Sequence, residues 1–271
     1  MTGPEMNADK AGRQYWDGTP RNMDVEFTPF RSLPGIRGFA RRRWDQAFRR
    51  SLGRLGRGRR ILELGCGGSA YLPYFATEFG LEVCGIDYSE GGCGLAREMC
   101  RRNGVQAKVI CANFFDVPSE FEHAFDAVAS FGVVEHFTDT AGTIRKFAEY
   151  LQPGGLLLTV VPNMSGLVGL GQRVLNEKVF HTHEVVTPDR LRLAYEAAGL
   201  DVIENDYFLF CNFGVISPGA DSGAIRKTGY AALRGLTALI WGLEWLIGAF
   251  PANRISSPYV WCVGRRPMQP V

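Results

Sequence analysis

Short hydrophobic runs alternate with stretches of helical periodicity from residue 60 onward. The runs predict strands near 60–64, 81–86, 106–111, 125–130 and 155–161, and later ones near 201–208 and 258–263. The stretches between or after the first five runs predict helices near 70–79, 91–103, 140–151 and 187–199. Such alternation is typical of a parallel sheet with helices on both faces. The chain is therefore expected to be a doubly wound α/β protein, whose ligands bind beyond the carboxyl ends of the strands.

Two segments stand outside this alternation, at residues 162–186 and at about 210–257. Part of the second, 231–250, is strongly apolar, but Arg234 and Glu244 interrupt it, which argues against a membrane-spanning helix. Core packing or a substrate lid is the favoured interpretation. A helix lying on a membrane surface is the alternative that is kept.

Arginines crowd the stretch before the first predicted strand. Apolar residues recur among them at helical spacing, at Trp44, Ala47, Phe48, Leu52 and Leu55. This pattern favours an amphipathic helix with a solvated basic face. The net charge of the whole chain is only +2, which gives no general attraction to polyanions. Nucleic acid is therefore not expected as a partner.

Composition suits one α/β domain with appendages, since 46% of the 271 residues are hydrophobic. The seven cysteines include no Cys-x-x-Cys pair, which argues against a disulfide framework or a zinc cluster. The N-terminus lacks the apolar run of a signal peptide. These observations favour a reducing, cytoplasmic location.

The segment Arg-Ile-Leu-Glu-Leu-Gly-Cys-Gly-Gly-Ser, which begins at Arg60, predicts a strand that runs into a tight turn. Gly65 and Gly67 let the backbone approach a ligand closely. The next hydrophobic run ends at Asp87, whose carboxylate can accept both hydroxyl hydrogens of a ribose. Glu63, just before the turn, would repel a pyrophosphate and attract a sulfonium cation. The combination favours S-adenosylmethionine over NAD.

These residues resemble the motifs of the class I S-adenosylmethionine-dependent methyltransferases, of the small-molecule type. The resemblance runs from about residue 60 to 207, with a last strand near 258–263. The matching segments are Glu63–Ser69, Gly85–Ser89, Cys111–Pro118, Phe125–Phe131 with Val133–Phe137, and Leu151–Val160. The resemblance implies a seven-stranded Rossmann-like sheet whose last strand is antiparallel, together with helical cap elements.

The resemblance also implies roles for single residues. Asp87 would hold the ribose, and Tyr88 would pack on the adenine. Asn113 stands where the family usually has an aspartate facing the adenine amino group, and its amide oxygen can accept the same hydrogen bond. The expected cofactor site comprises Glu63, Gly65, Cys66, Gly67, Asp87, Tyr88, Asn113, Phe114 and Ser130.

Methyl transfer to a neutral acceptor requires a group that removes a proton, and histidine suits this role best. His136 ranks first, because it lies just beyond the fourth predicted strand, where the resemblance places the acceptor pocket. His183, in the loop before the helix near 187–199, ranks second. A structural role for His136, with catalysis by alignment alone, remains the alternative. Only Glu184 adds a further ligand near His183, so no metal is expected.

The expected organisation is an N-terminal arm and helix at 1–57 that caps the substrate, a core at 58–209 and 258–271, and an apolar lid at 210–257. Aromatic residues of the arm and the lid are expected to wall an apolar acceptor pocket: Tyr15, Trp16, Trp241 and Trp245.

We therefore expect an enzyme that methylates an oxygen or nitrogen of a small or medium-sized, partly apolar metabolite, as in natural-product biosynthesis. One alternative is a C- or O-methyltransferase of a lipid-like or polyprenyl acceptor at a membrane surface, suggested by the apolar segment 233–250. A second alternative is a cofactor-binding regulator without turnover, because binding residues alone do not establish catalysis.

Overall fold

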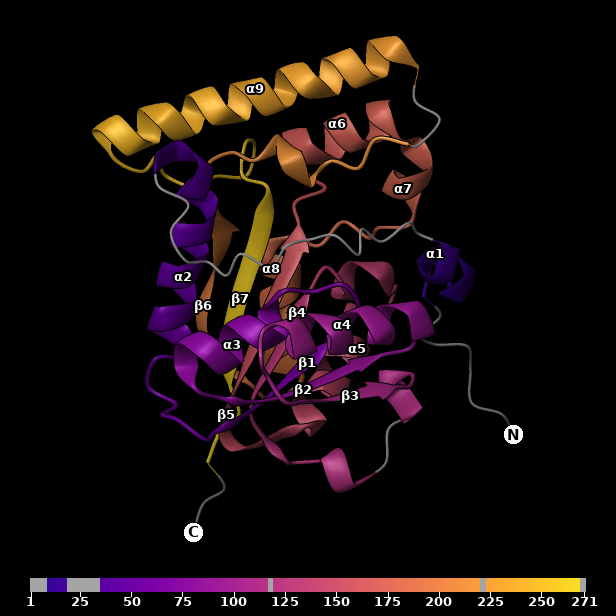
Figure 1. The fold of residues 1–271 in the computed structure, drawn as a ribbon, viewed down its shortest axis with the longest axis vertical. Helices are drawn as coiled ribbons and strands as arrows, with labels where there is room; N and C mark the ends of the chain where they lie inside the picture. Colours follow the sequence, from indigo (N-terminus) through magenta and orange to yellow (C-terminus); the bar gives the residue numbers. More distant parts are fainter. Residues whose placement is uncertain (1–8, 19–34, 117–118, 220–222, 269–271) are drawn as a thin grey trace.

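The computed structural model describes residues 9–18, 35–116, 119–219 and 223–268. Its centre is a seven-stranded sheet with the strand order β3-β2-β1-β4-β5-β7-β6 (Figure 1). The strands are β1 (Arg60–Leu64), β2 (Glu82–Asp87), β3 (Ala107–Cys111), β4 (Phe125–Phe131), β5 (Leu151–Pro162), β6 (Asp201–Phe208) and β7 (Tyr259–Arg265). β7 runs antiparallel to both of its neighbours, and the pairs from β3 to β5 are parallel. The predicted fold class is therefore confirmed.

Helices cover both faces of this sheet (Figure 1). One face packs against α2 (Phe39–Leu52), α3 (Tyr71–Phe79) and α4 (Glu90–Arg102), which contribute side chains such as Phe48 and Phe75 to one core cluster. The other face packs against α5 (Thr140–Glu149) and α8 (Pro188–Ala197), through side chains such as Phe147 and Tyr195. The two layers hold the strand ends, and thus the loops that follow them, in fixed positions.

The basic stretch before β1 forms the expected amphipathic helix α2. Trp44, Phe48 and Leu52 are buried, while Arg49 and Arg50 face solvent. Arg49 pairs with Asp45 on the same helix and with Glu78 of α3. Residues 19–34 of the expected N-terminal arm lie outside the described residues.

Both extra segments leave the sheet at the carboxyl ends of its strands. Pro162, at the end of β5, and Phe208, at the end of β6, both pair with Tyr259 of β7, so these two ends lie at one edge. The first segment forms α6 (Leu167–Leu175) and α7 (Glu177–His181), and the second forms the short 3-10 helix η5 (Phe213–Val215) and the long helix α9 (Ala224–Ile247). Figure 1 shows α6 and α9 together at this end of the molecule, and the short helix α1 (Arg13–Gly18) below α7.

Helix α9 is not packed in the core. Of the two interpretations favoured from its sequence, core packing or a substrate lid, the first is therefore wrong. Of its residues only Thr237 and Glu244 are buried. Within the described chain, no helix combines the length and the apolar character that crossing a bilayer requires.

The packing of the first loop on the sheet depends on a glycine. A Cβ atom at Gly85, in β2, would lie 2.6 Å from the Cys66 sulfur and 3.0 Å from a methyl carbon of Leu72. We expect Gly85→Ala to lower the free energy of unfolding by about 1–3 kcal/mol, because both neighbours are packed and must shift. Urea unfolding followed by circular dichroism measures this.

Gly94→Ala is the matched control, because Gly94 lies inside α4 with no atom within 4 Å of the added Cβ. It should raise stability by up to about 1 kcal/mol through helix propensity. Equal stability of Gly85→Ala and the wild type would show that the loop is not held by this contact.

Candidate active site

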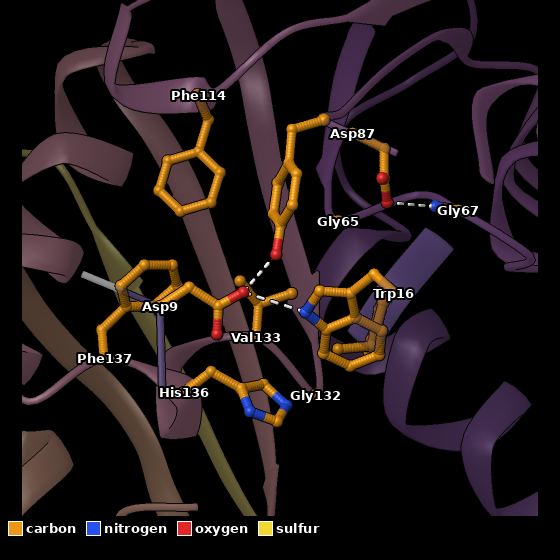
Figure 2. Close-up of a pocket in the computed structure, with 12 residues that line it drawn as sticks. Asp9, Trp16, Gly65, Gly67, Asp87, Phe114, Gly132, Val133, His136 and Phe137 are labelled. Carbon is orange, nitrogen blue, oxygen red and sulfur yellow. Dashed lines mark hydrogen bonds between the residues drawn. The ribbon is translucent and has the colours of Figure 1, made fainter. Parts of the chain in front are cut away.

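A cavity of about 620 Å³, mouth included, lies at the carboxyl ends of β1, β2 and β4 (Figure 2). The lining residues come from four loops and from the N-terminal segment: Asp9, Trp16, Gly65, Gly67, Asp87, Tyr88, Phe114, Phe131, Gly132, Val133, His136 and Phe137. Five of the expected cofactor residues are thus brought together, namely Gly65, Gly67, Asp87, Tyr88 and Phe114.

The glycine loop after β1 forms the wall of this cavity. Gly65 has a φ of +75°, which strains other residues, and a Cβ there would lie 2.4 Å from a methyl carbon of Val133. Its N–H donates to the carbonyl of Ile86 at 2.8 Å, which joins the loop to the end of β2. The turn therefore needs glycine both for its conformation and for space.

The Asp87 carboxylate fixes two backbone segments at the cavity wall. One oxygen accepts the Gly67 N–H at 2.8 Å (Figure 2), and the other accepts the Ser89 N–H at 2.8 Å. Because both oxygens are already oriented by the backbone, the acceptor directions that remain are fixed as well. This arrangement suits recognition of hydroxyl donors such as those of a ribose.

The N-terminal segment closes the opposite side of the cavity. The Asp9 carboxylate accepts hydrogen bonds from the Trp16 indole, at 2.9 Å, and from the Tyr88 hydroxyl (Figure 2). The Lys10 N–H donates to the carbonyl of His136 at 2.9 Å, and its ammonium pairs with Glu184 at 2.9 Å. Asp9, which lies outside the sheet, thus lines the cofactor cavity. No sequence motif around Asp9 predicted this position.

Four of the expected cofactor residues do not line the cavity. Cys66 is buried against Gly85 beneath the loop, and Ser130 is buried in β4. The Asn113 oxygen accepts the Phe115 N–H at 3.1 Å, so it shapes a turn. Glu63 is buried beneath the glycine loop, where burial raises the pKa of its carboxyl to about 8 against the hydrogen bonds from Ser69 and Leu72. Its expected attraction to a cation would act through the loop and not by contact.

A second cavity of about 720 Å³, mouth included, adjoins the first. The two share Trp16, Phe131, Gly132 and His136. Apart from Glu135 and His183, the remaining lining is aromatic and aliphatic, and consists of Trp44, Tyr71, Val160, Val161, Pro162, Val215 and Tyr259. The two cavities therefore have part of their walls in common.

The aromatic residues expected around the acceptor take different places. Trp16 lines both cavities, and Tyr15 packs edge-on against it at 5.0 Å between ring centroids. Trp241 instead packs on Phe39 and donates to the Cys211 carbonyl at 2.8 Å, and Trp245 is 58% exposed. Trp241 and Trp245 therefore do not line the second cavity, contrary to the expectation from the sequence. The reason is that η5 lies between α9 and this cavity, and η5 contributes Val215 to the lining.

The floor of the second cavity holds Glu135, His136 and His183, each of which offers one polar atom within 4.8 Å of the others. Nδ1 of His136 donates to the Thr182 carbonyl at 3.0 Å, and Nδ1 of His183 donates to the Val179 carbonyl at 2.6 Å. Carbonyls accept only, so Nε2 carries the lone pair in both neutral rings. The Oε2 atom of Glu135 is buried and has no hydrogen-bond partner among the residues that the structure describes.

Burial sets the protonation states of this cluster. It lowers the pKa of His136 to about 4, with the nearby His183 as the second cause, and it lowers the pKa of His183 as well. It raises the pKa of Glu135 to about 8. At neutral pH all three groups are therefore uncharged, and two of them present lone pairs. Such a set can accept a proton, and two imidazoles with a carboxyl group are also a donor set that divalent metals use. The expectation that no metal is used stays a prediction.

Glu135 was missed by sequence reasoning, although it precedes His136 directly. Its burial and its orphaned oxygen are consequences of how the loop after β4 packs against the loop after α7. In particular, the Glu184 N–H donates to the Glu135 carbonyl at 2.6 Å, which joins the two loops that carry the histidines.

Comparison with known proteins agrees with this geometry. The family model of a methyltransferase domain matches residues 36–205. The ubiquinone biosynthesis O-methyltransferase of Nitrobacter winogradskyi is 29% identical over 215 residues, which cover 76% of this chain and 80% of that protein. The enzyme of the same name from Chromobacterium violaceum is 27% identical, with coverage of 72% and 83%.

Among solved structures, a geranyl diphosphate C-methyltransferase from Streptomyces coelicolor A3(2), in complex with Mg²⁺, geranyl diphosphate and S-adenosyl-L-homocysteine, is similar in fold. Its TM-score is 0.58 at 14% identity, with 94% of this chain and 96% of that chain covered. The family match spans more than half of the chain and contains the glycine loop, Asp87 and the strand ends that form the cavity. The chain therefore belongs to the methyltransferase-domain family and is a class I S-adenosylmethionine-dependent methyltransferase.

Proposed function

We propose that this enzyme methylates a hydroxyl oxygen of an apolar, lipid-like acceptor of the quinone-precursor class. The observation that carries the proposal is the second cavity, which is lined by aromatic and aliphatic side chains and contains two neutral histidines beside the cofactor cavity. The names of the ubiquinone biosynthesis relatives support oxygen as the acceptor atom and a quinone precursor as the class. This choice replaces the broader expectation of a small metabolite methylated at oxygen or nitrogen.

The first cavity fits S-adenosylmethionine, because Gly65 and Gly67 present bare backbone in its lining and Asp87 presents an oriented carboxylate. When bound, the cofactor supplies an activated methyl group. We propose that Asp87 holds the ribose, that Gly65 and Gly67 contact the chain of the amino acid, and that Tyr88 and Phe114 enclose the adenine. Asp9 keeps the Tyr88 hydroxyl and Trp16 in place on the open side.

The second cavity positions the acceptor. Trp16 and Phe131 contact both cavities, so they can hold an apolar ring against the methyl donor and exclude water between the two. Trp44, Tyr71 and Tyr259 extend the apolar lining away from the cofactor. This depth favours an acceptor with an apolar substituent attached to the reactive ring.

His136 is the proposed proton acceptor. It lines both cavities, whereas His183 lines only the second. The Thr182 carbonyl holds its Nδ1–H, so Nε2 is the atom that takes the proton from the acceptor hydroxyl. A pKa of about 4 makes His136 a weak base, and Glu135, when it ionises, would raise the proton affinity of the ring through the negative charge.

The proposed function is tested with methyl-labelled cofactor and phenols that carry alkyl tails of increasing length. We expect methyl ethers as products and a kcat/KM that rises with tail length, because each added methylene leaves water for an apolar lining. Equal turnover of phenols with and without tails, or methylation only of the corresponding anilines, would contradict the proposal.

Asp87→Ala should weaken cofactor binding by about 1–3 kcal/mol, because charge-assisted hydrogen bonds are lost. Isothermal titration calorimetry with S-adenosylhomocysteine measures the effect. Asp201→Ala, at the exposed start of β6, is the matched control and should bind normally. An unchanged affinity of Asp87→Ala would remove this residue from the site.

His136→Ala should lower kcat by about 10²–10⁴-fold and leave the affinity for the cofactor nearly unchanged, because a general base acts on the acceptor proton. His183→Ala should have the smaller effect. If His183→Ala alone shows the large loss, the two histidines exchange roles. Wild-type turnover should survive dialysis against a chelator; a loss that added Zn²⁺ or Mg²⁺ restores would assign the cluster to a metal.

The pH dependence of turnover should report the ionisation of Glu135. Its raised pKa means that the carboxyl is neutral below about pH 8 and negative above it, so the rate should rise as pH increases through this region. Glu135→Gln keeps the shape but cannot ionise, and it should lose that rise. The ionisation of the acceptor is common to both proteins, so the difference between the two pH profiles belongs to Glu135. Identical profiles would exclude the role.

A further inference from the structure

Helix α9 exposes a continuous apolar stripe on the side that faces away from the sheet. Its side chains recur at spacings of three and four residues, at Ala232, Leu236, Leu239, Leu243 and Leu246. Leu239 is 63% exposed and Leu246 is 70% exposed. The opposite side is already used, because Tyr230, Leu233 and Ile240 pack on the cluster around η5. The stripe is therefore a second apolar face, with no partner among the described residues.

The exposed surface continues from α9 onto α6. Leu167, Leu170 and Val174 of α6 are exposed at spacings of three and four residues. The exposed Ile255, which follows α9 in the chain, lies at the start of α6, because its carbonyl accepts the Leu167 N–H at 2.7 Å. Figure 1 shows both helices at the end of the molecule to which the strands point. Apolar surface of this extent usually marks a binding face. We call it the α6–α9 surface.

The exposed charges of α9 are of one sign. The basic residues of α9 are Arg226, Lys227 and Arg234, and all are exposed. Its single acidic residue, Glu244, is buried. Lys227 and Arg234 are seven residues apart and thus share one side of the helix, about 100° or more around it from the leucines. A helix that exposes an apolar stripe and only basic charges is a pattern of helices that lie in the interface of an anionic bilayer.

We infer that the α6–α9 surface binds this enzyme to the surface of a bilayer that contains anionic lipids. The leucines of α9 enter the region between headgroups and acyl chains, and the basic side chains reach the phosphates. Pairing with a second copy through the same face would add positive charges with no exposed carboxylate on α9 to neutralise them. The inference goes beyond the proposed function, because binding to lipid requires neither cofactor nor acceptor.

The location of the surface explains what such binding would achieve. β5 and β6 end at the edge from which α6 and α9 arise, and the same strand ends border the acceptor cavity through Pro162 and Tyr259. An enzyme held by this face would therefore turn the acceptor side of the sheet toward the membrane. An acceptor with an apolar tail could then enter without crossing water.

Vesicle flotation tests the inference on the full chain, with phosphatidylcholine vesicles that do or do not contain phosphatidylglycerol. The wild type should float with the anionic vesicles, and less with neutral ones or at high salt, because screening weakens the attraction of the basic residues. The double variant Leu239→Glu/Leu246→Glu should lose more than about tenfold in its partition coefficient, because two exposed leucines that would enter the bilayer become charges. Leu193→Glu is the matched control, since this leucine of α8 is 57% exposed outside the surface.

Two further measurements keep the outcome decisive. Calorimetry with S-adenosylhomocysteine should give the same affinity for all variants, which shows that each has folded. Light scattering after size-exclusion chromatography should show the wild type and the double variant with the same mass. The inference would be overturned if the wild type failed to float, if the double variant floated as well as the wild type, or if neutral vesicles bound equally well. A wild-type dimer that is absent in the double variant would also overturn it. None of these results depends on which acceptor is methylated.

Discussion

The carboxylate of Asp87 is the contact on which the cofactor cavity depends. It accepts one N–H from the loop after β1 and one from the residue that caps α4, and both hydrogen bonds are 2.8 Å long. Ser89 in turn accepts the Gly92 N–H with its side chain, which begins the helix. A single ionisable group therefore sets the relative positions of two loops and one helix. Charge-assisted bonds of this kind are among the strongest that a neutral backbone can make.

Two further acids near the site, Glu63 and Glu135, are buried and have no cationic partner within the described part of the chain. Burial raises the pKa of each to about 8. The folded chain thus binds protons that the unfolded chain, with an ordinary value of 4.5, releases. Stability contributed by these groups is therefore present at low pH and decreases as pH rises from about 4.5 through 8. Burying an ionisable carboxyl at the acceptor cavity lowers the stability of the folded protein at neutral and higher pH. An apolar residue would fill the same space without this cost.

The two cavities and the α6–α9 surface lie at one end of the molecule because of topology. Parallel strands bring all their carboxyl ends to one edge, and the segments inserted after β5 and β6 begin there. Additions at this edge can change the acceptor or the place where the enzyme works without disturbing Gly65, Gly67 or Asp87. The insertion that forms α9 is of this kind, since the sheet is complete without it.

The sequence by itself determined the sheet, because hydrophobic runs must be buried and their alternation with helices permits few topologies. It also determined Gly65, Gly67 and Asp87, since local backbone geometry and a strand end suffice to place them. It could not place Asp9, Glu135 or Val215 at the cavities, because these arrive through contacts between segments far apart in the chain. Tertiary structure alone decided which face of α9 is buried. The apolar periodicity of this helix allows either face to be buried, and the position of η5 determines which leucines remain exposed.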